Sequence, residues 1–106
     1  MGKIDDRLTE IGVEIPEAAA PVANYVGYVQ SGNMVFVSGQ VTIDNGEFKF
    51  IGKVGEDYTV EEGAEAARLC GINIIAQLYA ATDGNLDRVK RIVKLGGFVY
   101  STPDFV

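Results

Sequence analysis

Residues 24–47, NYVGYVQSGNMVFVSGQVTIDNGE, decide the fold because they place two turn signals between apolar segments. Residues 31–33 and 44–47 are rich in side chains that tolerate the positive φ values of tight turns. The apolar residues around these turns favour strands over residues 24–30, 34–43 and 48–51. This stretch therefore predicts consecutive antiparallel hairpins.

A long helix is expected directly after these hairpins. Thr59-Val60-Glu61-Glu62 matches the capping box, in which a Thr hydroxyl and a Glu carboxylate satisfy free backbone N–H groups at a helix start. Small and apolar residues then recur at helical spacing until a stop at residues 82–84. The predicted buried stripe consists of Ala64, Ala67, Gly71, Ile74 and Leu78, with Cys70 and Ile75 beside it. Burial in that stripe makes Cys70 a core residue in this interpretation.

Shorter sequence signals predict further elements before the hairpins and after the long helix. A short helix is predicted over residues 3–12, with Gly12 as its stop, and the prolines at 16 and 21 predict an extended lead-in to the sheet. After the long helix, residues 92–99 read as a strand interrupted by Gly96-Gly97, and residues 101–104 read as the start of another helix.

The order of these elements, with hairpins first and a helix second, predicts an α+β fold: an antiparallel-rich sheet with helices on one face. One long helix leaves much of such a sheet bare. We therefore expect residues 1–106 to form a single domain whose C-terminal helix and strands are missing from this sequence.

Charge and composition exclude several classes of function. The chain has 15 acidic and 9 basic side chains, a formal charge of −6, so it has no basic stripe for nucleic acid. The charged N-terminus resembles neither a signal peptide nor a membrane span, which makes a cytoplasmic protein the expectation. Because the sequence contains no histidine, its residues cannot form a Ser-His or Cys-His pair or a His-ligated zinc site. We expect no metal site.

The candidate chemistry lies at Ser38-Gly39, where an apolar strand changes abruptly to Ser-Gly-Gln. A glycine lets a ligand approach the backbone N–H, and the Ser38 hydroxyl could donate to the same anion, as carboxylate and oxyanion sites require. The alternative interpretation is a β-bulge in which the serine bonds to backbone. The sequence alone leaves both open.

Several motifs together resemble one known family. They are Asn24-Tyr25, GNMVFVSGQ at residues 32–40, GKVG at 52–55, AARLC at 66–70 and LDRVKR at 86–91. This set is similar to the Rid family, also called the YjgF-like or reactive-intermediate-deaminase family. The resemblance implies a chorismate-mutase-like α+β fold, assembled as a homotrimer with ligand clefts between subunits. It also implies hydrolysis of small enamine and imine acids to 2-keto acids and ammonia without a cofactor.

Carried over by position, the resemblance assigns Tyr25 to the lining of the cleft, Ser38 to a place near the substrate and Gly39 to the N–H that meets its carboxylate. Tyr25 and Ser38 are thus the catalytic candidates, and all three are candidates for substrate binding. The family also uses an arginine for the carboxylate and a glutamate for water, both from later strands that this sequence lacks.

Pro103 occupies the position of a loop asparagine in the family, which is typical of a divergent branch. The alternative function is therefore a non-catalytic trimer that binds a small carboxylate or another metabolite. The endoribonuclease activity also associated with the family is disfavoured by the acidic charge and the absent histidines.

Overall fold

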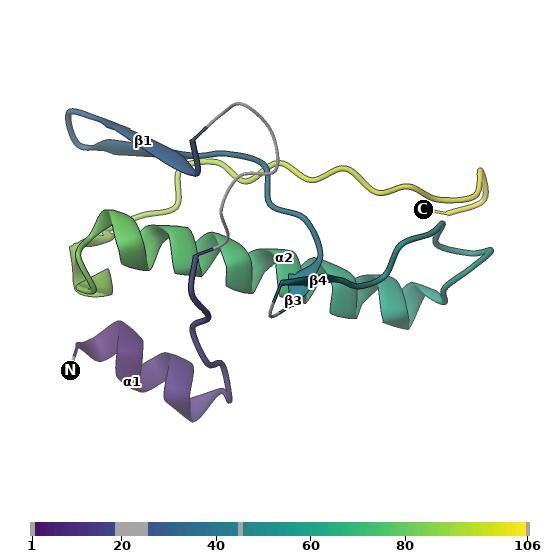
Figure 1. Ribbon diagram of the computed structural model, residues 1–106, viewed down its shortest axis with the longest axis horizontal. Coiled ribbons are helices and arrows are strands. Elements are labelled where there is room, and N and C mark those ends of the chain that lie inside the picture. Colours follow the sequence, from purple (N-terminus) through teal and green to yellow (C-terminus); the bar gives the residue numbers. More distant parts are fainter. Residues whose placement is uncertain (1, 19–25, 45, 106) are drawn as a thin grey trace.

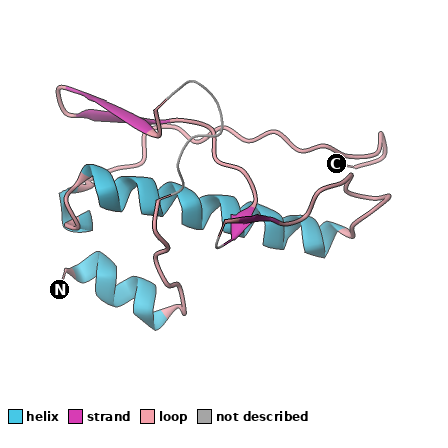
Figure 2. Ribbon diagram, in the orientation of Figure 1, coloured by secondary structure: helices cyan, strands magenta, loops and turns pink. Residues whose placement is uncertain are grey.

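The computed structural model describes residues 2–18, 26–44 and 46–105, and its centre is one long helix (Figures 1 and 2). The strands β1, β2 and β3 pack against that helix, α2, whereas α1 lies beside the short 3-10 helix η1. The elements in chain order are α1 (Lys3–Glu10), β1 (Tyr28–Ser31), β2 (Met34–Val37), β3 (Ile43–Asp44), β4 (Glu47–Phe48), α2 (Val60–Ala81) and η1 (Leu86–Arg88). The α+β prediction is confirmed.

The first predicted hairpin is present and tight. Strands β1 and β2 pair antiparallel with Tyr28 opposite Val37 and Ser31 opposite Met34, which leaves a two-residue turn between them. Gly32 takes φ +59° in this turn, the left-handed conformation that glycine adopts without steric cost. The strand begins at Tyr28, later than predicted. Of the predicted strand 24–30, residues 24 and 25 lie outside the described residues.

The second predicted hairpin is also present, but it is short. Ile43 faces Phe48 and Asp44 faces Glu47, with Gly46 at φ +83° in the turn. The predicted strand over 48–51 is wrong beyond Phe48, because Phe50 takes φ +53° and so turns the backbone out of the extended conformation. The predicted continuous strand over 34–43 is likewise interrupted after Val37. Two two-stranded sheets therefore take the place of one.

The capping box of α2 is confirmed. Glu62 N donates to Thr59 Oγ1 at 3.1 Å, and Thr59 N donates to Glu62 Oε1 at 2.9 Å. The predicted apolar stripe is wrong at its start, since Ala64 and Ala67 are exposed. The residues of α2 that are buried are Asn73, Ala76 and Gln77. Backbone atoms of the hairpin segments lie over this face, so polar side chains are accommodated there by hydrogen bonding.

The predicted N-terminal helix is confirmed as α1, which ends two residues before the expected stop. Lys3 N and Ile4 N donate to the carboxylate of Asp87 at 2.9 and 3.0 Å. These bonds hold the pKa of Asp87 below its usual range, the Ile4 bond contributing most. Leu8 is the buried residue of α1. The helix is thus attached to the η1 segment through its first N–H groups and one apolar side chain.

The predicted strand over 92–99 is absent from the described residues. Among the described residues, backbone hydrogen bonds to another part of the chain occur only just beyond its end, where Val54 N donates to the Tyr100 carbonyl and Thr102 N to the Val54 carbonyl, each at 3.0 Å. Without a neighbouring strand, residues 91–100 are all exposed. The predicted helix start at residues 101–104 is a turn instead, closed by Phe105 N donating to the Thr102 carbonyl at 3.2 Å.

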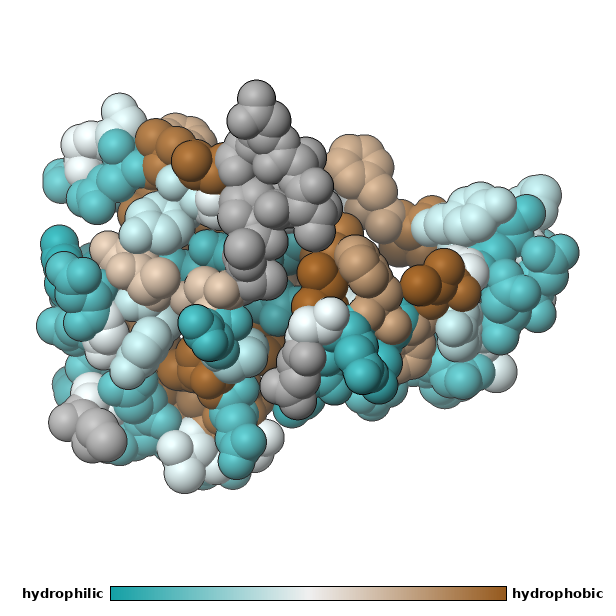
Figure 3. All heavy atoms as spheres, in the orientation of Figure 1, coloured by the Kyte–Doolittle hydropathy of each residue, from teal (hydrophilic) through white to brown (hydrophobic). Residues whose placement is uncertain are grey.

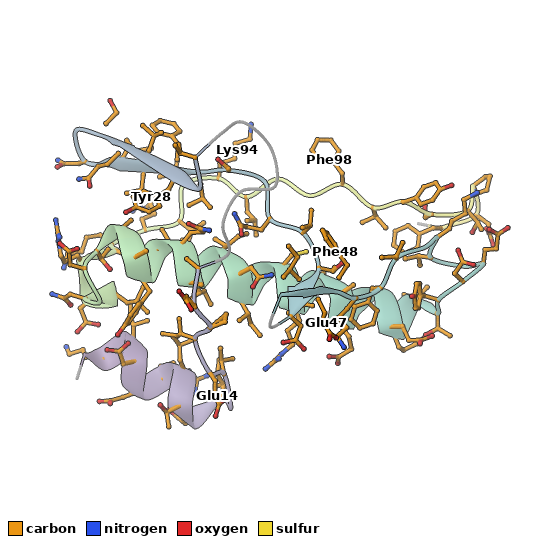
Figure 4. All side chains as sticks on the ribbon, in the orientation of Figure 1. Glu14, Tyr28, Glu47, Phe48, Lys94 and Phe98 are labelled. Carbon is orange, nitrogen blue, oxygen red and sulfur yellow. The ribbon has the colours of Figure 1, made fainter. Side chains whose placement is uncertain are left out.

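Apolar side chains consequently remain at the surface (Figure 3). Phe98 points away from the molecule and is fully exposed (Figure 4), and Leu95 is 72% exposed. Within the described ranges, no helix combines the length and apolar character that crossing a membrane requires.

Candidate functional site

Ser38 directly follows the last residue of β2. Its N–H donates to the Gly27 carbonyl at 2.9 Å, which extends the pairing of the first hairpin by one step. The Ser38 hydroxyl donates to the Val26 carbonyl. A hydroxyl has only one hydrogen, so Ser38 would have to give up this bond to donate to an anion. In the present geometry, Ser38 offers a ligand the lone pairs of Oγ.

Gly39 is exposed and surrounded by open space. A Cβ at this position would meet no heavy atom within 4 Å, and the backbone does not adopt the positive φ region that favours glycine. Among the hydrogen bonds of the described residues, none is donated by Gly39 N. The Gly39 N–H therefore has both the donor capacity and the space to bind a ligand oxygen.

The turn after Ser38 is held by Gln40, whose side-chain amide donates to the Ser38 carbonyl at 3.1 Å. This bond fixes the carbonyl on one side of the Ser38-Gly39 peptide unit. Because a peptide is planar, it also fixes the direction of the Gly39 N–H on the other side. The local sequence Ser-Gly-Gln thus supports an oriented amide donor.

Two buried amides of α2 lie beneath this segment, and they were missed by sequence reasoning. Asn73 Nδ2 donates to the carbonyls of Val41 and Ile43 at 3.0 and 2.9 Å. A Cβ built on Gly27 would lie 2.5 Å from Gln77 Oε1, so the Gln77 side chain lies directly against that glycine. The available signal was an Asn and a Gln four residues apart in the otherwise apolar second half of the helix.

Tyr25 lies outside the described residues, so its predicted place in the cleft stays a prediction. The nearest described tyrosine in sequence is Tyr28, which is the one half-buried residue of β1. It lies between the hairpin and α2 (Figure 4). Of the three predicted site residues, the structure describes two, Ser38 and Gly39.

The groups whose pKa values are shifted lie outside the Ser38-Gly39 segment. No group of three or more His, Cys, Asp or Glu side chains that could hold a metal ion occurs among the described residues. Burial raises the pKa of the Cys70 thiol, which disfavours the reactive thiolate form. A hydrogen bond from the Thr102 hydroxyl lowers the pKa of Asp104, at the far end of the exposed segment 91–100.

A separate apolar hollow of about 280 Å³ lies between α1, the second half of α2 and η1. It shares no lining residue with the Ser38-Gly39 segment. Its walls are Ile4, Leu8, Ile75, Leu78, Leu86, Val89, Lys90, Arg91 and Ile92.

Comparison with known proteins identifies relatives along nearly the whole chain. The family described as “YjgF/chorismate_mutase-like, putative endoribonuclease” matches residues 5–103. Protein TCP17 of Trypanosoma cruzi is 45% identical over 104 residues, covering 98% of this chain and 64% of that protein.

Two solved structures are similar in both sequence and fold. Atu1372 of Agrobacterium tumefaciens, a protein of unknown function, matches with a TM-score of 0.87 and 45% identity, over 97% of this chain and 62% of its own. A “putative endoribonuclease” of Shewanella oneidensis MR-1 matches with a TM-score of 0.80 and 42% identity, over 86% of this chain and 60% of its own. The chain thus spans less than two thirds of the length of each of these relatives.

Proposed function

Because the chain belongs to the YjgF/chorismate-mutase-like family, and so has the fold expected from its motifs, we propose that it binds small 2-imino and enamine acids and hydrolyses them to 2-keto acids and ammonia. The observation that carries the proposal is the Gly39 N–H, which is exposed, oriented by its neighbours and unbonded among the described residues. Such a donor suits the carboxylate that all these substrates share.

The carboxylate is the part of the substrate that Gly39 would bind. Hydrogen bonds from a backbone N–H to a carboxylate are charge-assisted and stronger than neutral ones. The absence of a side chain at Gly39 lets the ligand oxygen reach the amide without a steric clash. Ser38 Oγ, whose hydrogen is given to Val26, would then accept a hydrogen bond from the substrate nitrogen or from water.

The reaction needs no cofactor. The enamine 2-aminoacrylate first tautomerises to 2-iminopropanoate, and water then adds to the C=N carbon. The resulting carbinolamine loses its C–N bond as the C=O bond forms. In balance, 2-iminopropanoate, water and one proton give pyruvate and ammonium. A positioned hydrogen-bond acceptor near the imine carbon accelerates the addition of water by removing its proton.

Assembly into a homotrimer is part of the proposal, because the site would be completed at a subunit interface. The exposed apolar side chains of residues 91–100 are consistent with association, since monomeric proteins rarely expose large contiguous apolar patches. Light scattering tests this point. A trimer has three times the 11.4 kDa mass of the chain, and a clean monomer would contradict the assembly.

The activity is tested by ammonia release from 2-aminoacrylate generated in situ by a pyridoxal-phosphate-dependent enzyme. The proposal predicts faster release than in buffer, and slower release with Gly39→Ala than with the unchanged protein. Release at the buffer rate would eliminate the deaminase function for this chain.

A second candidate is carboxylate binding without turnover. It is favoured by the Ser38 hydroxyl, whose hydrogen is already bound to the Val26 carbonyl. Thermal stabilisation by pyruvate without ammonia release would select this candidate. Absence of both effects would overturn the proposed site. The endoribonuclease description of relatives gains no comparable support, because the chain carries a net charge of −6 that repels RNA.

A further inference from the structure

The α2 residues Asn73 and Gln77 are unusual because they are buried amides in the otherwise apolar second half of the helix. Asn73 is 6% exposed and Gln77 is 3% exposed. Burying a polar side chain costs free energy unless it is hydrogen-bonded, so an apolar residue would serve a purely packing role better. Their hydrogen bonds and contacts indicate what they do there.

Asn73 fixes the chain just after the candidate site. Its amide nitrogen donates both hydrogens, to the carbonyls of Val41 and Ile43. Between them, Ile43 N donates to the Val41 carbonyl at 2.8 Å, so the backbone turns sharply at this point. The Asn73 side chain thus holds both ends of residues 41–43, a segment that begins two residues after Gly39.

Gln77 supports the chain opposite the site. It lies one helical turn after Asn73, on the same face, and its side chain lies against Gly27. Gly27 provides the carbonyl that accepts from Ser38 N, and Val26 provides the carbonyl that accepts from the Ser38 hydroxyl. Displacement of Gly27 would therefore move both partners of Ser38.

We propose that Asn73 and Gln77 are positioning residues that set the geometry of Ser38-Gly39 from beneath, Asn73 through Val41 and Ile43 and Gln77 through Gly27. This inference deepens the proposed function and rests on it for its significance. Neither residue touches the ligand. Their effect on ligand binding passes through the backbone on the two sides of the site.

The test is backbone amide hydrogen exchange in three variants of the full chain. Asn73→Asp keeps the size of the side chain but removes the donors, whereas Gln77→Met keeps its length and removes the amide. Thr82→Val is the matched control, because the buried Thr82 hydroxyl donates only within α2, to the carbonyls of Leu78 and Tyr79. Exchange at Val54 N, which donates to the Tyr100 carbonyl, is the reference for changes that are not specific to the site.

Asn73→Asp is expected to raise exchange at Ile43 N by about tenfold relative to Val54 N, as loss of about 1.4 kcal/mol of local hydrogen bonding implies. Gln77→Met is expected to raise exchange selectively at Ser38 N, and Thr82→Val at neither. If Asn73→Asp does not fold, Gln77→Met carries the test. Equal changes at Val54 N and at the site amides would overturn the inference, because they would mean a purely structural role.

Pyruvate titration of the same variants separates the inference from the proposed function. Selective exchange together with weaker pyruvate binding supports both. If the variants show selective exchange but the unchanged protein does not bind pyruvate, the positioning role is retained and the carboxylate site is overturned. Unchanged exchange at Ser38 and Ile43 would overturn the positioning role, whatever pyruvate does.

Discussion

Replacing Gly39 by alanine separates a ligand-binding role from a structural one, because the folded chain itself gives no reason for a glycine there. A Cβ would meet no heavy atom within 4 Å, and φ lies outside the positive region. Alanine also restricts the unfolded chain, so Gly39→Ala should stabilise the protein by about 0.4–1 kcal/mol. For a domain of this size the melting temperature should rise by about 2–6 °C.

Ligand binding should change in the opposite direction. The new methyl group would occupy the space through which a carboxylate reaches the Gly39 N–H, and loss of a hydrogen bond to a charged group costs about 1.5–3 kcal/mol. The dissociation constant for pyruvate, measured by calorimetry, should therefore increase by roughly 10- to 150-fold.

Gly71→Ala provides the control for this experiment. Gly71 lies within α2 and also has open space at its Cβ position, so alanine should stabilise the helix by about 1 kcal/mol. Pyruvate affinity should be unaffected. If Gly39→Ala and Gly71→Ala behave alike in both assays, the assignment of Gly39 to the site is refuted.

Three further outcomes are expected from other parts of the structure. Thr59→Ala removes the capping bond to Glu62 N and should lower the free energy of unfolding, measured in urea, by about 1 kcal/mol; no change would mean that the α2 cap contributes nothing. Asp87→Asn should reduce the loss of folding stability that occurs as the pH falls in the acid range. The pKa of Asp87 is lowered in the folded state, so its contribution is present above its unfolded pKa and is lost as the pH falls through the folded one; identical melting curves of the two proteins between pH 2 and pH 5 would contradict this. Cys70, whose pKa is raised by burial, should react with iodoacetamide at pH 8 more slowly than free cysteine, and equal rates would show that the thiol is accessible.

The local signals in the sequence were sufficient for the two hairpin turns and for the cap of α2. Gly32, Gly46 and the Thr59–Glu62 pair act through neighbouring backbone atoms, so residue type and spacing alone specify them. The family motifs likewise led to the fold, which the match over residues 5–103 confirms.

The errors arose where distant parts of the chain interact. The buried face of α2 was predicted from apolar periodicity, but hydrogen bonding to Val41 and Ile43 buries Asn73 instead. Residues 92–99 have strand composition, yet a strand also needs a neighbour to pair with, and the described residues supply one only near Tyr100. Similarly, Asp87 caps α1 from 84 residues away along the chain, an interaction that no local pattern reveals.

For the candidate site, too, local sequence predicted one part of the geometry and long-range contacts determined the rest. Its position at Ser38-Gly39 followed from a change of residue type at the end of an apolar strand. The direction of the Ser38 hydroxyl did not, because the Val26 carbonyl that accepts its hydrogen lies 12 residues earlier in the chain. The expected donor at Ser38 is therefore an acceptor in this geometry, and Gly39 N is left as the donor.

The most direct test of the carboxylate site is a titration of the ¹⁵N-labelled protein with pyruvate, followed through the backbone amide resonances. We predict that the Gly39 amide shows the largest saturable change and moves downfield, as expected for an N–H that gains a carboxylate acceptor. Saturable binding that leaves the Gly39 resonance unmoved, or no binding at all, would contradict the account.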